Sequence, residues 1–189
     1  MKRYLLAAKY SSFVMLVCTF IFILNTLLPI NFTQWGIVPR QTDHLLGILF
    51  APFLHANLAH LSSNFVPFVI FGTLVGLQNA KRFWTLFIFF VVTTGVLVWL
   101  FARGNSVHIG MSGVIYALWG YLLVYGFVRR QIVSLIISLI TLFIYGGLVF
   151  GVLPSTPSVS FESHLFGAII GALTGYYLAK RAVQCSRRY

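Results

Sequence analysis

Three groups of polar residues interrupt an otherwise apolar chain, and together they could hydrolyse a peptide or ester bond. Ser112 lies in the sequence Gly110-Met111-Ser112-Gly113, and His164 opens a series of glycines spaced along one helix face. An imidazole can activate a serine hydroxyl by taking its proton. His60 and Asn64 lie four residues apart, so a helix would place both on one face. These residue types indicate a serine hydrolase.

Ser112 is the predicted nucleophile. The sequence is not the Gly-x-Ser-x-Gly turn of soluble hydrolases, because Val114 occupies the last position. Instead, Gly110 frees the backbone ahead of a predicted helix, and Met111 and Gly113 flank the serine. The unpaired N–H groups at the start of that helix could hold an oxyanion. A simple helix-capping serine is the alternative interpretation.

His164 is the predicted general base, because ionisable groups within membrane spans are costly and usually functional. Its helix carries glycines three, seven and eleven residues further on, at Gly167, Gly171 and Gly175. Such a face packs closely against small residues on a neighbouring helix. The alternative is a packing helix with an incidental histidine. Asp43 and Glu162 fall in predicted loops, so the sequence predicts a Ser-His dyad without a carboxylate.

His60 and Asn64 are predicted to stabilise the negative charge of a tetrahedral intermediate, together with the Ser112 N–H group. Polar contacts between helices are an equally good explanation of this pair. His55 and His108 are interpreted as membrane-interface residues without assigned chemistry.

Composition places these residues in a membrane protein. Hydrophobic residues make up 59% of the 189 residues and charged residues 8%, against about 25% charged in soluble domains. A bilayer core needs about 20 apolar residues per helical span. Six charge-free stretches meet or nearly meet that length: 10–39, 44–80, 83–102, 104–128, 131–161 and 163–179. The expected fold is a single all-α domain, residues 1–189, with six transmembrane helices and an interfacial first loop at residues 31–58.

Basic residues orient this predicted bundle, because cytoplasmic loops collect Lys and Arg. One side would hold 11 of the 13 basic residues, including both termini: Lys2, Arg3, Lys9, Lys81, Arg82, Arg129, Arg130, Lys180, Arg181, Arg187 and Arg188. Both acidic residues and all five histidines fall on the other side. The termini are therefore predicted to be cytoplasmic and the chemistry to face outward. The net charge of +11 fits lipid headgroups flanking the spans better than nucleic acid.

The cysteines and the N-terminus add little to the functional prediction. Cys18 and Cys185 fall at different predicted depths, so no disulfide is expected, and no metal-ligand or cofactor spacing is present. Lys2 and Arg3 precede an apolar run as in a signal peptide, but Lys9 interrupts it and the run is too long. This segment is expected to remain as the first span of a bacterial plasma-membrane protein.

From about His55 to Ala179 the chain resembles the rhomboid intramembrane serine proteases. The matching motifs are His55-x4-His60-x3-Asn64, Gly110-Met111-Ser112-Gly113-x2-Tyr116-Ala117-x2-Gly120 and His164-x2-Gly167-x3-Gly171. The resemblance implies that Ser112 is the nucleophile, His164 the base, and His60 and Asn64 the oxyanion site. It further implies that Tyr116 packs against the catalytic imidazole and that no cofactor is needed.

The chain departs from the family pattern at several positions. It reads Leu46-Gly47 where many rhomboids have Trp-Arg, and it lacks an acidic residue near Gly76. Ser163 precedes the predicted base, and Pro67 lies in the second predicted helix. Inactive relatives usually lose the serine or the histidine, and this chain keeps both.

The predicted function is cleavage of transmembrane substrates near the outer membrane face. By the resemblance, the fifth span and the loop from Pro154 to Glu162 would move to admit substrate. The alternative is a non-catalytic rhomboid-like protein that binds transmembrane helices. A transporter would predict inverted repeats and broken helices, which the sequence lacks. The natural substrate and the oligomeric state stay open.

Overall fold

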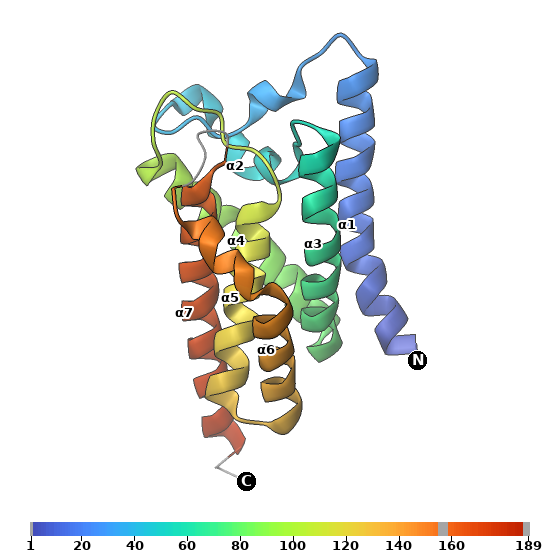
Figure 1. Ribbon diagram of the computed structural model, residues 1–189, viewed down its shortest axis with the longest axis vertical. Coiled ribbons are helices and arrows are strands. Elements are labelled where there is room, and N and C mark those ends of the chain that lie inside the picture. The colour runs from blue at the N-terminus through green and yellow to red at the C-terminus, as the bar shows by residue number, and fades with distance from the viewer. Residues whose placement is uncertain (1, 155–158, 187–189) are drawn as a thin grey trace.

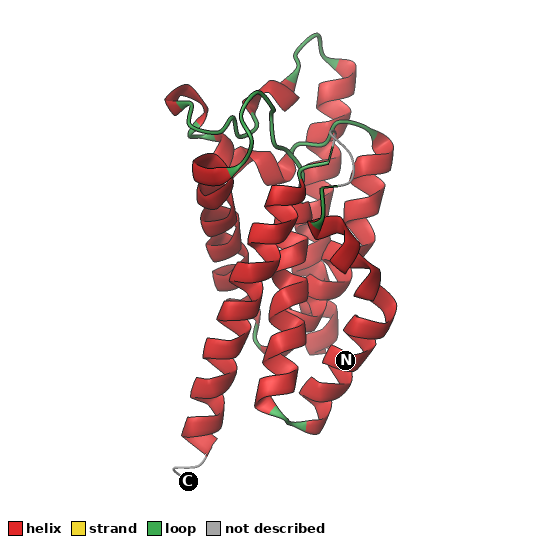
Figure 2. Cartoon of the chain, turned by 60° about the vertical axis from the view of Figure 1, so that its left-hand side comes forward, coloured by secondary structure: helices red, strands yellow, loops and turns green. Residues whose placement is uncertain are grey.

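The computed structural model describes residues 2–154 and 159–186, and within them every regular element is a helix (Figures 1 and 2). The α-helices are α1 (Lys2–Leu27), α2 (Gly47–Phe50), α3 (Leu58–Gln78), α4 (Ala80–Phe101), α5 (Ser112–Arg129), α6 (Ile132–Tyr145) and α7 (Phe161–Ser186). Four 3-10 helices join them: η1 (Phe32–Trp35), η2 (Thr42–His44), η3 (Ala51–Phe53) and η4 (Gly146–Val152).

Five helical segments are long and apolar enough to cross a membrane. They are Leu6–Leu27, Leu58–Gln78, Lys81–Phe101, Ser112–Arg129 and Ile132–Val152. The last joins α6 to η4. The predicted helical membrane protein is thus confirmed. The sixth predicted span corresponds to α7, which has 26 residues but is not among the five, so six spans stay a prediction.

Helix α5 occupies the middle of the bundle, with α7 and α6 beside it (Figure 1). Twelve of its 18 residues are buried. Its contact with α7 is close because the predicted glycine face of α7 lies directly on the α5 backbone. A Cβ atom at Gly175 would lie 2.7 Å from the Tyr121 carbonyl oxygen, and one at Gly171 would overlap the Ala117 carbonyl. The close packing predicted for this face is confirmed.

The segment between α1 and α3 crosses one end of the bundle (Figure 1). It is fastened to the end of α4 and to the loop between α4 and α5. Ile37 forms an isolated antiparallel bridge with His108. The Arg40 guanidinium donates to the main-chain oxygens of Ala102 at 2.8 Å and Leu100 at 3.2 Å, at the C-terminal end of α4. A helix end leaves such carbonyls without helical partners, so Arg40 acts as a cap.

Helix α1 begins and helix α7 ends toward the opposite end of the bundle from this loop (Figure 1). That arrangement places the starts of α3, α5 and α7 near the loop. These are the turns that carry His60, Ser112 and His164.

Candidate active site

Ser112 and His164 are in hydrogen-bond contact. Ser112 is the first residue of α5, and His164 lies in the first turn of α7. The Nε2 atom of His164 lies 2.8 Å from the Ser112 Oγ atom. The glycine face of α7 makes this possible, because larger side chains would hold the two helices apart.

The second ring nitrogen of His164 determines which tautomer is present. Its Nδ1 atom lies 2.8 Å from the carbonyl oxygen of Gly151 in η4. A carbonyl only accepts, so Nδ1 carries the proton and donates it. Nε2 is therefore free to accept the Ser112 hydroxyl proton, as a general base must.

Tyr116 packs flat on the imidazole of His164. The two ring centroids are 4.2 Å apart and the planes differ by 6°. Tyr116 lies one turn after Ser112 and is buried. The contact implied by the family resemblance is present, and it limits rotation of the imidazole.

Gly151 was not predicted from the sequence. Its carbonyl orients His164, and its α-carbon packs against the hydroxyl of Tyr116 so closely that a Cβ atom there would overlap it. The functional group is a main-chain oxygen, which any residue has. The only sequence signal is the cluster of glycines at Gly146, Gly147 and Gly151.

No carboxylate among the described residues contacts His164. Glu162 is 6% exposed and turns to Arg103, with its Oε1 atom 3.4 Å from Nε and 3.3 Å from the main-chain N of that residue. Asp43 lies in η2. A main-chain carbonyl thus takes the place that an acid has in a Ser-His-Asp triad.

His60 and Asn64 share one cavity with the Ser-His pair. The cavity has a volume of about 750 Å³ and is lined by Ser112, Tyr116 and His164 as well. The Asn64 Nδ2 atom donates to the His60 carbonyl at 2.7 Å, which leaves its second N–H for another acceptor. The structure therefore brings all four predicted polar residues together.

Position 110 requires glycine because of its backbone conformation and because a side chain lies close to it. Its φ angle is +109°, where side chains are disfavoured, and a Cβ atom there would lie 2.5 Å from the His60 Nε2 atom. Its N–H donates to the Ala51 carbonyl at 2.8 Å. The neighbouring Met111 is fully buried in the hydrophobic core of the bundle.

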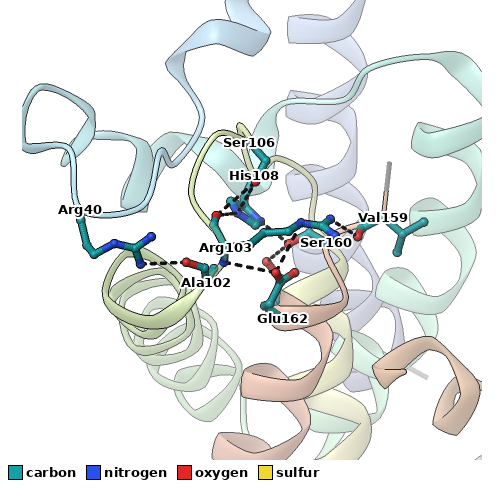
Figure 3. A network of polar contacts seen from close by, with 9 residues as sticks. Arg40, Ala102, Arg103, Ser106, His108, Val159, Ser160 and Glu162 are labelled. Atoms are coloured by element: carbon teal, nitrogen blue, oxygen red, sulfur yellow. Dashed lines mark hydrogen bonds and ion pairs between the residues drawn. The ribbon is translucent and has the colours of Figure 1, made fainter. Parts of the chain in front are cut away.

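A polar network at the same end fastens the loop after α4 to the start of α7 (Figure 3). The His108 ring lies between Ser160, at 2.5 Å from Nδ1, and Ser106, at 3.0 Å from Nε2. The Ser160 Oγ atom is also 2.6 Å from the Ser163 Oγ atom. Arg103 adds a 2.7 Å bond to the Val159 carbonyl. His108 was predicted to lie at the interface without a role, and the structure instead makes it a link between two parts of the site.

Burial disfavours the charged forms of His55 and His108, which both lie outside the spanning helices. Desolvation lowers the pKa of His108. Desolvation, together with the nearby charge of His60, lowers the pKa of His55 to about 4. The His55 ring is 2% exposed and packs edge-on against His60, with centroids 5.0 Å apart. His55 is therefore an uncharged side chain that packs against the ring of His60.

Comparison with known proteins identifies the family. The Rhomboid domain family model matches residues 42–181. The chain belongs to the rhomboid family. It is 38% identical over 153 residues to an uncharacterized protein of Mycobacterium tuberculosis, covering 76% of this chain and 63% of the relative.

Two further relatives of this rhomboid chain extend the comparison. An uncharacterized Mycobacterium leprae protein is 40% identical, with 76% of this chain and 60% of that protein aligned. Rhomboid-like protein 11, chloroplastic, of Arabidopsis thaliana is 29% identical over 69% of this chain and 51% of its own length. The chain spans about three fifths of the length of the mycobacterial relatives.

Two of the departures from the rhomboid pattern, at Gly47 and Gly76, have local structural explanations. A Cβ atom at Gly47 would overlap the Gly36 carbonyl, so a larger residue does not fit where many rhomboids have arginine. Arg40 fastens the loop instead. At Gly76, a Cβ atom would lie 3.0 Å from that of Ala7, where α3 packs on α1.

Proposed function

We propose that this rhomboid chain is an intramembrane serine endopeptidase. The observation that carries the proposal is the 2.8 Å contact between Ser112 Oγ and His164 Nε2, in an imidazole whose other nitrogen is bound to Gly151. A serine that only capped a helix would need no oriented base.

In the proposed reaction, His164 takes the hydroxyl proton while the Ser112 oxygen attacks the substrate carbonyl carbon. The carbonyl oxygen becomes an oxyanion, which the Ser112 N–H and the side chains of His60 and Asn64 stabilise by hydrogen bonds. His164 then gives its proton to the leaving amine, and an acyl-enzyme remains. Water, deprotonated by His164, then attacks the ester carbonyl, and His164 returns that proton to the Ser112 oxygen as the acid product leaves.

The proposed setting is a six-span bundle, with α7 as the sixth span and both termini cytoplasmic. The basic clusters support this orientation, since they favour the cytoplasmic side. Cleavage would then occur near the outer face of a bacterial plasma membrane. Bacterial relatives support that location.

The proposed substrates are transmembrane proteins whose helix unwinds near its end, because an intact helix holds its carbonyls in hydrogen bonds. The entry route would involve α6, η4 and the loop from Pro154 to Glu162. Residues 155–158 of that loop lie outside the described part of the chain. The exposed apolar face of α6, which includes Phe143 and Ile144, supports lipid or substrate contact there.

A non-catalytic protein that binds transmembrane helices is the second candidate. The 750 Å³ cavity would serve binding as well as hydrolysis. The oriented Ser112 and His164 pair favours the enzyme, because binding alone needs neither the serine nor the tautomer.

The test is covalent labelling of the detergent-purified chain by a fluorophosphonate probe, which reacts with activated serines. We expect labelling of the unmodified chain and of Ser62→Ala, whose hydroxyl donates to the Leu58 carbonyl of its own helix and, among the described residues, to nothing else. Ser112→Ala and His164→Ala should lose labelling while keeping their helical circular dichroism. Equal labelling of all four proteins, or none of a folded unmodified chain, contradicts the proposal, and the latter result favours the binding protein.

A further inference from the structure

A second polar cluster lies at the end of the bundle opposite the active site, where α3 and α5 finish and α4 starts (Figure 1). It consists of Gln78 from α3, Arg82 from α4, and Tyr121, Tyr125 and Arg129 from α5. Three candidate membrane spans have their boundaries here, at Gln78, Lys81 and Arg129. The cluster therefore lies where apolar helix surface gives way to polar surface.

Two guanidinium groups converge on one buried phenol. The Arg82 Nη1 atom lies 3.4 Å from the Tyr125 hydroxyl oxygen, and the Arg129 Nη1 atom also donates to it. Both groups lie over the same ring, with Cζ atoms 5.7 and 5.5 Å from its centroid. Tyr125 is only 2% exposed, so it forms the floor between two partly exposed cations.

No carboxylate side chain balances this pair of charges. The chain has two acidic residues, and Asp43 and Glu162 both lie at the active-site end. Like charges held this close repel one another strongly in a low-dielectric surrounding. The neighbouring Gln78 neutralises neither charge, since its side-chain oxygen is only a polar acceptor, 2.7 Å from Arg82.

The Tyr125 hydroxyl also has a proton to donate. Its oxygen accepts from both arginines, and no described side chain or main-chain carbonyl accepts from it. The Tyr121 hydroxyl differs, because it donates to Gln78 at 3.1 Å. The cluster thus presents two cationic donors and one neutral donor, and no described residue supplies it with an anionic acceptor.

We propose that Arg82, Arg129 and Tyr125 form a binding site for a phosphate group, supplied by an anionic lipid headgroup at the membrane surface. Arginine suits such a ligand because its planar fork matches phosphate oxygens. The phosphate accepts from both guanidiniums and from the Tyr125 hydroxyl, and it ties the start of α4 to the end of α5. The site is independent of the proposed proteolysis.

The experiment measures binding of phosphatidylglycerol to the full chain in neutral detergent, by native mass spectrometry and by the rise in Tm. Phosphatidylcholine with the same acyl chains is the lipid control. Inorganic phosphate at matched ionic strength tests the phosphate group alone. The variants are Arg82→Gln with Arg129→Gln, Tyr125→Phe, and a control pair, Lys180→Gln with Arg181→Gln. The control removes the same charge from α7, where these side chains contact only Tyr176 and Tyr177 among the described rings.

We expect phosphatidylglycerol to bind the unmodified chain and the control pair alike. Loss of charge-assisted hydrogen bonds should weaken binding about tenfold or more in the double arginine variant. Tyr125→Phe keeps both cations and the ring, so it should fold normally and bind several-fold more weakly, which keeps the test valid if the arginine variant does not fold. Stabilisation by inorganic phosphate, lost in the same variants, would identify a free phosphate as the source. Equal binding by all variants, or no preference over phosphatidylcholine, overturns the proposal.

Discussion

His164 donates its Nδ1 proton to a neutral carbonyl, and this limits the strength of the base that we propose. A carboxylate would stabilise the imidazolium formed during proton transfer by its full charge, whereas the Gly151 carbonyl offers only a dipole. The stacked Tyr116 ring adds a face that attracts a cation. The main contribution of the Gly151 carbonyl and the Tyr116 ring is therefore to orient the imidazole of His164.

Replacing Tyr116 separates the role of its ring from that of its hydroxyl. Tyr116→Phe keeps the stacked ring, so we expect activity within a few-fold of the unmodified chain. Tyr116→Ala leaves the imidazole free to rotate, and we expect kcat to fall by about 100-fold or more, as for a misplaced catalytic group. Cleavage of a model transmembrane substrate by both variants measures the difference. Comparable activity in Phe and Ala variants would show that the ring does not position His164.

At this scale the sequence predicts the side chains but not their main-chain partners. Ser112, His164, His60 and Asn64 stand out as polar groups in apolar helices, and the structure brings them together. The Gly151 carbonyl and the His108 to Ser160 contact could not be predicted. These contacts depend on how η4 and two loops fold back on the site. Neither the periodicity of the sequence nor the residue types predict the path of those segments.

Among the elements, the α5 and α7 pair decides whether the dyad exists. Gly171→Ala places a Cβ atom against the Ala117 carbonyl, which is main chain and cannot rotate away. We expect a loss of about 1–3 kcal/mol in unfolding free energy, as for overpacking, and loss of fluorophosphonate labelling.

Gly147→Ala is the matched control for that substitution. No atom lies within 4 Å of the position its Cβ would take. Its unfolding free energy should stay within about 0.5 kcal/mol of the unmodified chain. Thermal unfolding in detergent compares the two variants, and equal Tm values would contradict the assigned role of the glycine face.

The glycine spacing of α7 was readable in the sequence because one helix contains the whole pattern. The contacts of the loop before α3 could not be predicted in this way. Arg40 belongs to that loop, but the carbonyls it caps belong to the end of α4, about 60 residues further along. A contact of that kind becomes visible only when both elements are placed.

Over the described part of the molecule, both acidic residues share one end with the candidate active site, and Lys81, Arg82, Arg129 and Arg130 lie at the other end. The composition was enough to predict a helical membrane protein. The number of spans was not settled by it, because α7 combines its glycine face with Glu162, Lys180 and Arg181. The glycines let α7 pack closely, but they contribute less apolar surface than larger side chains would, and the three charged residues lower its hydropathy further.

Reporter fusions test the proposed orientation. Alkaline phosphatase is active only outside the cytoplasm, so a fusion after Asn105 should be active and one after Arg130 inactive. The reason is the asymmetry of basic residues between the two ends. A fusion after Lys180 is the control for α7, and activity there would show that α7 does not cross the membrane.

The bond between His164 and Gly151 also has a thermal consequence. Gly151 belongs to η4, none of whose residues is buried, so this segment is held less firmly than the helices around it. When η4 detaches, the imidazole proton can move to the other nitrogen and the serine loses its acceptor. Warming would then abolish the proposed activity while the bundle is still folded. The upper temperature limit of that activity would be set by the seven residues of η4 rather than by unfolding of the whole molecule.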